Sequence, residues 1–218
     1  MVDSVRAFLL AAGLGLGLLV VSIFFYSNLE TVVIYPQYLT AATSSAVTVS
    51  ATVTATISCS TNGSSTAFGA LTDSVVTTAS PNASTTMSCS NSSAGCTLFA
   101  KDAGGGGNPG LYNATTTALI ESPNASFSAS STLVAGTEGF GIQATTTAVG
   151  TGATLTVAAR YLSSGNIVGG LGVTNITLAS SNATSSGREV VVTHKAAIAA
   201  STPAGTYSDT ITYECTAN

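Results

Sequence analysis

The side chains that could carry chemistry in this chain are few and widely spaced. There are four cysteines (Cys59, Cys89, Cys96 and Cys215), one histidine (His194) and nine acidic residues. Acid–base or nucleophilic catalysis needs a base held by an orienting partner beside a nucleophile. His194 instead lies in an apolar run, VVVTHKAAIA, with no such group nearby in sequence. We interpret it as a strand residue near the surface of a sheet and predict that the protein is not an enzyme.

The glycine-rich stretch at residues 103–110, AGGGGNPG, does not have the pattern of a ligand-binding loop. It lacks the Gly-Lys-Ser/Thr ending of a phosphate loop, and no helical pattern follows it. Asp102 and Asp209 could contribute to a calcium site, but no acidic cluster with the spacing of a calcium loop surrounds them. We therefore interpret the stretch as a flexible hairpin loop and predict no catalytic residue, metal or cofactor.

The composition excludes two classes of partner. Charged residues make up 6% of the chain, Lys and Arg together number five, and the net charge is −4. Binding to nucleic acid or to an anionic membrane surface needs a basic patch, so neither partner is expected. Thr and Val are abundant and favour pleated, half-buried surfaces. The chain therefore predicts a β-rich extracellular domain with Ser and Thr on its solvent face.

The N-terminal region has the composition of an apolar helix. The residues from Ala7 to Tyr26 contain no charge and are numerous enough to span a bilayer. Residues 1–26 are predicted to be a long signal peptide cut near Ala42, an uncleaved membrane anchor, or a helix that packs with its own copies in a filament core. Each alternative exports the rest of the chain and limits membrane contact to residues 7–26. Residues 27–45 form a spacer.

A long alternating run follows the spacer. Val47, Val49, Ala51 and Val53 lie on one parity, and Ser and Thr occupy the other as far as Ser60. This period is typical of a β-strand with one buried face, yet the run is about twice the usual strand length. Beyond it, short alternating segments are separated by frequent turn sequences such as STNGSS and STPAG. This spacing predicts that residues 46–218 form an all-β sandwich or barrel.

Motifs at both ends of residues 46–218 resemble a known family. ISCS contains Cys59, Phe68-Gly69 follows, STTMSCS contains Cys89, and TPAGTYSDTITYEC stands near the end. In this order they resemble the spore-coat-protein-U-like domain and the related subunits of archaic chaperone–usher pili, which are secreted bacterial surface proteins. The resemblance implies an immunoglobulin-like β-sandwich that lacks its last strand and is completed by a donor strand from a neighbouring subunit.

The resemblance also divides the long alternating run between two roles. Residues 46–53, with Val47, Val49, Ala51 and Val53, would be the donor strand, and residues 54–60 would begin the chain's own sandwich. Repeated donation builds a head-to-tail homopolymer. The expected function is therefore a structural subunit of a pilus-like, cell-surface filament. An assembly chaperone or an outer-membrane secretion partner is the further partner that this implies.

An even number of cysteines in an exported chain predicts disulfides. The family resemblance favours Cys59–Cys89, which leaves Cys96–Cys215. The rival arrangement is Cys89–Cys96 with Cys59–Cys215.

Two alternatives to donor-strand assembly follow from the apolar segment. The protein could be a monomeric, membrane-anchored surface or adhesive domain whose long strand folds back on its own sheet. It could also be a pilin whose N-terminal helix packs in the filament core, as in type IV pili, although the usual Glu of such a helix is missing.

Overall fold

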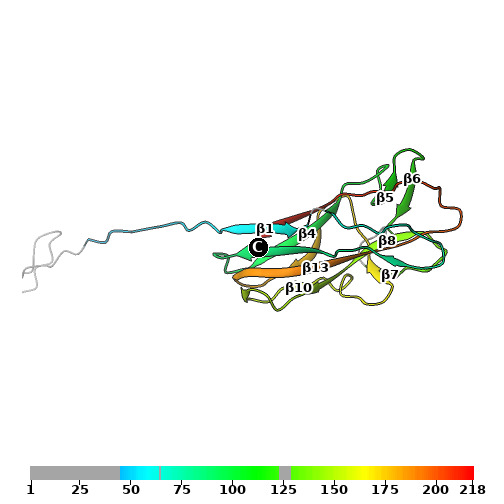
Figure 1. Cartoon of the computed structure of the whole chain (residues 1–218). Coiled ribbons are helices and arrows are strands. Elements are labelled where there is room, and N and C mark those ends of the chain that lie inside the picture. The colour runs from blue at the N-terminus through cyan, green and yellow to red at the C-terminus, as the bar shows by residue number, and fades with distance from the viewer. Residues whose placement is uncertain (1–44, 64, 123–128) are drawn as a thin grey trace, which may run out of the picture. The chain divides into compact units, whose positions relative to one another are not determined.

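The computed structural model describes residues 45–63, 65–122 and 129–218. Contacts within the chain separate residues 1–51 from residues 52–218, and every strand belongs to the second unit. The described residues contain strands and no helix (Figure 1), which confirms the all-β prediction. The predicted helix of residues 1–26 and nearly all of the spacer lie outside the described residues.

The larger sheet is antiparallel and is built around the long strand β13. Its order is β1-β3-β13-β8-β11-β7, and two short strands, β2 and β9, also pair with β13. The bounds are β1 Ile57–Asn62, β2 Thr77–Thr78, β3 Ala83–Cys89, β7 Ser130–Thr132, β8 Gly139–Thr146, β9 Thr151–Gly152, β11 Ile167–Gly169 and β13 Ser185–Ala197.

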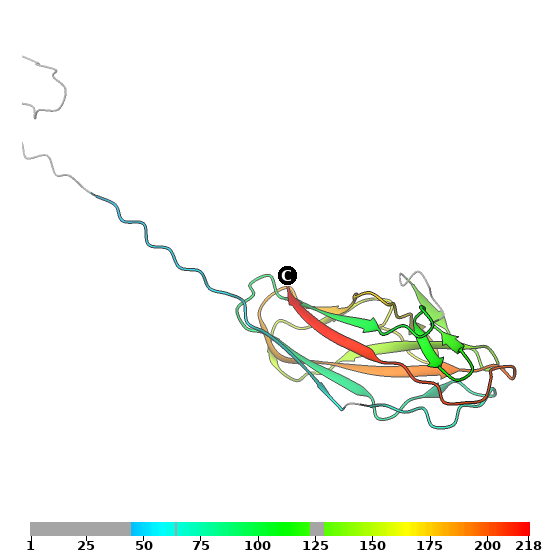
Figure 2. The same ribbon diagram turned by 90° about the horizontal axis from the view of Figure 1, so that it is seen from above.

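The smaller sheet has the order β10-β12-β4-β14, and all of its pairs are antiparallel. Its strands are β10 Thr156–Val157, β12 Ile176–Ser180, β4 Cys96–Asp102 and β14 Ile211–Ala217. A separate hairpin, β5 Gly110–Asn113 with β6 Ala118–Glu121, follows the glycine-rich stretch. The last strand, β14, is drawn in red in Figure 2.

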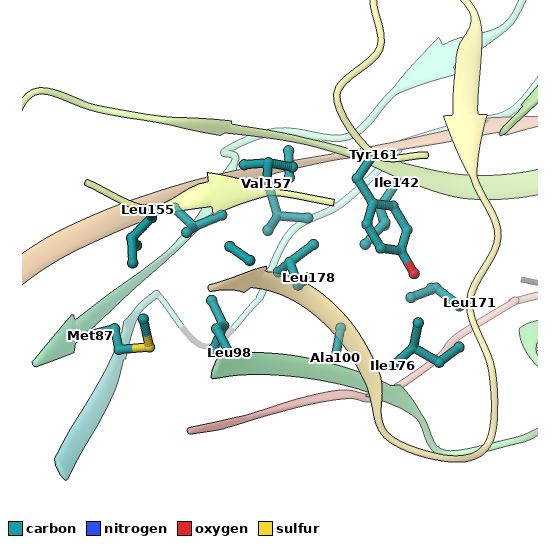
Figure 3. Packing of buried hydrophobic residues seen from close by; sticks show 14 of the residues in the cluster. Met87, Leu98, Ala100, Ile142, Leu155, Val157, Tyr161, Leu171, Ile176 and Leu178 are labelled. Atoms are coloured by element: carbon teal, nitrogen blue, oxygen red, sulfur yellow. The ribbon is translucent and has the colours of Figure 1, made fainter. Parts of the chain in front are cut away.

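The main hydrophobic core lies between the two sheets. Met87 and Ile142 come from the larger sheet, Leu98 and Leu178 come from the smaller one, and all four are fully buried (Figure 3). Their positions follow the period-two alternation of the strands, because β4 buries every second residue and β3 does so from Thr85 to Cys89. Two sheets that share a core in this way form a β-sandwich, as the sequence predicts.

Tyr161 fills one part of this core from the chain between β10 and β11. Its ring is fully buried, and its hydroxyl donates a hydrogen bond to the carbonyl of Gly170 at 2.9 Å. The Arg160 guanidinium lies 4.8 Å from the centre of the ring. Gly169 packs so closely on the ring that a Cβ at that position would collide with it. A buried tyrosine is stable here because its polar end is satisfied.

The core can be tested with matched leucine variants. Leu98 is 0% exposed, and Leu162 is 64% exposed. Leu98→Ala should lower the free energy of unfolding by about 2–5 kcal/mol, because it leaves a cavity between the sheets. Leu162→Ala should change it by no more than about 0.5 kcal/mol. Denaturant unfolding of both variants measures the difference, and equal effects would contradict the core assignment.

Candidate functional site

The candidate site is the open edge of the sandwich, formed by β1 and β14. Among the described residues, β1 is the outermost strand of the larger sheet and β14 is the outermost strand of the smaller one. Ile57 stands opposite Cys89, and Ala217 stands opposite Cys96. Because Cys89 and Cys96 are joined by a disulfide, β1 begins at the end of the sandwich where β14 finishes. The two edge strands therefore lie along the same side of the domain.

The inner face of β1 is poorly covered. Cys59 is paired with Met87 and Thr61 with Thr85, and residues directly opposite in an antiparallel pair point to the same face. Met87 and Thr85 are completely buried, whereas Cys59 and Thr61 are exposed. The core is therefore incompletely covered at the open edge.

Half-buried apolar side chains line the same edge. Ile57 on β1, and Ile211 and Tyr213 on β14, pack against the core while remaining partly accessible. β14 alternates these half-buried residues with exposed polar ones, Thr212 and Glu214. The open edge thus combines partly accessible apolar side chains with the unpaired sides of two strands, a surface on which another strand can add.

The disulfides correct the favoured pairing of the cysteines. The structure joins Cys59 to Cys215 and Cys89 to Cys96, with Cα–Cα distances of 6.0 and 6.2 Å, so neither Cys59–Cys89 nor Cys96–Cys215 forms. The register explains the difference, because Cys59 stands opposite Met87 and is two positions away from Cys89. Such diagonal neighbours are about 7–8 Å apart, whereas disulfides usually span about 4.4–6.8 Å.

Both disulfides connect one sheet to the other. Cys59 and Cys89 belong to the larger sheet, and Cys215 and Cys96 belong to the smaller one. The Cys59–Cys215 bridge joins the two strands of the open edge directly. Disulfides of this kind are typical of an oxidising compartment, either extracellular or periplasmic.

The segment that was predicted to be the donor strand has no strand partner among the described residues. The chain carries no strand from Ser45 to Thr56, and β1 begins at Ile57 instead of Thr54. Val47, Val49 and Val53 are 85%, 89% and 79% exposed, and Ala51 is also exposed. An alternating apolar row in such a segment leaves a large apolar surface in water.

His194 occupies a different environment from the one predicted. It is only 5% exposed and shares its parity with the core residues Val192 and Ala196, so it faces the interior instead of the sheet surface. Its ring stacks on Phe140, with the centres 6.4 Å apart. The Nδ1 atom is buried and has no hydrogen-bond partner among the described residues. Burial therefore lowers the pKa of His194 to about 4.

The glycine-rich stretch is held by a carboxylate of the protein itself. Asp102 at the end of β4 is fully buried, and it accepts hydrogen bonds from the backbone N–H groups of Gly104 at 2.7 Å and Gly110 at 2.9 Å. Two backbone amides of the stretch are thus already occupied by a carboxylate of the protein. In the described ranges, no group of three or more His, Cys, Asp or Glu side chains is arranged to hold a metal ion.

Comparison with known proteins supplies no relative: no family model, no curated protein and no solved structure matches the chain. Within the part of the chain that the structure describes, there is no helix long and apolar enough to cross a membrane. The apolar segment at residues 7–26 lies outside that part.

The two disulfides should differ in their contribution to stability. They close loops with sequence separations of 156 and 7 residues. In the loop-entropy description, these loops correspond to about 5 and about 2.5 kcal/mol. Replacing Cys59 and Cys215 with Ala should therefore lower the free energy of unfolding more than replacing Cys89 and Cys96. Denaturant unfolding measures both variants, and peptide mapping without reduction checks the pairing.

The buried histidine should make the domain sensitive to acid. Its folded-state pKa is about 4 and its ordinary value is 6.5, so the stabilising contribution is complete above pH 6.5 and is lost as the pH falls toward 4. The free energy of unfolding of His194→Phe, relative to that of the wild type, should rise by up to about 3 kcal/mol across this window. Thermal or denaturant unfolding of both proteins from pH 4 to 7 provides the comparison. If the free energies of unfolding of the two proteins changed equally with pH, the lowered pKa of His194 would be contradicted.

Proposed function

We propose that the protein is a structural subunit of an extracellular bacterial filament, in which residues 46–53 of one copy complete the sandwich of the next. The observation that carries this proposal is the exposure of Val47, Val49 and Val53, whose segment has no strand partner in the described ranges. The sandwich itself offers an unpaired edge with partly accessible apolar side chains. The exposed segment lacks a strand partner, and the open edge lacks a further strand, so the segment and the edge can complete each other.

The sheet order supports an immunoglobulin-like arrangement with one strand missing. β1, β3, β13 and β8 are neighbours in one sheet, and β12, β4 and β14 are neighbours in the other. A complete immunoglobulin-like sandwich places a further strand beside the strand that corresponds to β14. In the proposed assembly, the incoming segment takes this place.

The energetic gain comes from two sources. The incoming strand forms main-chain hydrogen bonds with the unpaired edge, and it removes apolar side chains from water. Full burial of a valine contributes about 1.5–3 kcal/mol, so three valines that are 79–89% exposed supply a large favourable term. Covering the edge also prevents unspecific pairing between exposed strands.

The same contact accounts for a filament. The donor segment and the open edge are different surfaces of one chain, so each copy can donate to one neighbour and accept from another. Such a head-to-tail contact continues without closing unless its rotation generates a ring. Partners of the subunit are other copies of itself, together with an assembly chaperone or an outer-membrane secretion protein that protects the open edge beforehand.

A second candidate function depends on the apolar segment at residues 7–26. Its length and lack of charge suit a membrane anchor, which would leave a monomeric surface or adhesive domain, or a helix packed within a filament core. N-terminal sequencing of the native protein separates these alternatives, because a start near Thr43 removes the apolar segment. A monomer would also melt at a temperature that does not depend on protein concentration.

The donor role can be tested on single residues of opposite parity. Val49→Asp places a charge in the apolar row and should abolish filaments in electron micrographs. The control, Ser50→Asp, adds the same charge on the polar face of the same segment and should preserve them. Deletion of residues 43–53 should give folded subunits without filaments. Normal filaments from the deleted protein would exclude the donor role.

A further inference from the structure

Two carboxyl groups meet where β4 ends and β14 begins. Asp102, the last residue of β4, stands opposite Ile211, the first residue of β14. Asp209 lies two residues before Ile211, and the Ala103 N–H donates to the Thr210 carbonyl at 2.9 Å. The Asp102 and Asp209 carboxyl groups are close enough for each to influence the pKa of the other. A bond between two carboxyl groups requires that one of them carry a proton.

The remaining hydrogen bonds favour Asp209 as the group that holds the proton. Both oxygens of Asp102 accept backbone N–H groups, from Gly104 and from Gly110, as expected for an ionised carboxylate. In Asp209, Oδ1 accepts the Thr210 N–H at 2.6 Å, while Oδ2 is buried and accepts no hydrogen bond from the described residues. A proton on Oδ2 of Asp209 would give this atom a hydrogen-bond partner, because it could be donated to the Asp102 carboxylate.

We propose that the Asp102–Asp209 pair is a proton-dependent latch, which fastens the glycine-rich stretch and the start of β14 to the end of β4 while one proton is shared. Loss of the proton leaves two negative charges side by side in a buried place, and their repulsion separates the two segments. This inference does not depend on filament formation, because the latch acts within one copy of the domain.

The surroundings of the pair favour the protonated form. Burial raises the pKa of Asp209 to about 7, and the negative charge of Asp102 adds to the effect. Burial also raises the pKa of Asp102. The hydroxyl of Tyr213 on β14 lies near Asp209, and no cation contributes to the pKa shift of either aspartate. The Tyr213 hydroxyl is itself buried without a hydrogen-bond partner among the described residues.

The sign of the pH dependence follows from this shift. The folded domain holds the Asp209 proton up to about pH 7, whereas an opened segment releases it near the ordinary value of 3.8. The latch is therefore strongest below about pH 3.8 and weakens as the pH rises from there to about 7. From pH 5.5 to pH 8.5, the equilibrium constant for opening should increase about 30-fold.

Hydrogen exchange of the full chain tests the latch directly. Amides of residues 103–110 and 209–211 should lose about 30-fold protection between pH 5.5 and 8.5, after correction for intrinsic exchange rates. In Asp209→Asn, the side-chain amide donates to Asp102 without titrating, so protection should not change with pH. Asp73→Asn replaces an exposed carboxyl and should retain the wild-type change.

Carbon NMR of aspartate carboxyl groups provides a test that needs no variant to fold. One carboxyl of the wild type should titrate near pH 7. Titration of all the carboxyl groups below about pH 5, or unchanged protection at pH 8.5, would overturn the proposal. So would recovery of protection at pH 8.5 by added Ca²⁺, which would show that a cation, and not a proton, joins the pair.

Discussion

The disulfides between the two sheets are the constraint on which the rest of the domain depends. Both lie at the end where β1 begins and β14 finishes, and each joins one sheet to the other. They fix the position of the two edge strands relative to the core, although neither strand pairs with the other. The open edge is thus held in one geometry, which in the proposed assembly would reduce the entropy lost when another strand binds.

Two of the few charged residues, Arg188 and Glu189, fasten neighbouring segments of the domain through hydrogen bonds. Arg188 donates hydrogen bonds to the carbonyls of Val149, Gly152 and Ala153, which fastens the turn around β9 to β13. Glu189 accepts hydrogen bonds from Ser84 and Thr147, and these bonds lower its pKa. Because charged residues are few, uncharged Ser and Thr occupy many of the other exposed positions and give the surface little attraction for a charged partner.

The class of fold could be predicted from the sequence, but the disulfide pairing and the contacts between distant strands could not. The alternation around β4 and β14 predicted strands with one buried face, and the structure has them. The disulfide pairing depends on register, since a shift of two positions separates Cys59 from Cys89, and register is not visible in an isolated strand. The burial of His194 and the meeting of Asp102 with Asp209 depend on which distant strands become neighbours. The acids that end CTLFAKD and precede TITYEC were visible, but their proximity was not.

The placement of the basic residues has a consequence for the resistance of the domain to proteases. In the described part of the chain they are Lys101, Arg160, Arg188 and Lys195. Lys101 lies within β4, and Arg188 and Lys195 lie within β13. Arg160 is in a turn, but its guanidinium donates to the Thr177 carbonyl and packs on Tyr161. A protease that cuts after basic residues must therefore unfold part of the sandwich before it can cleave, so the domain resists such digestion for as long as it stays folded.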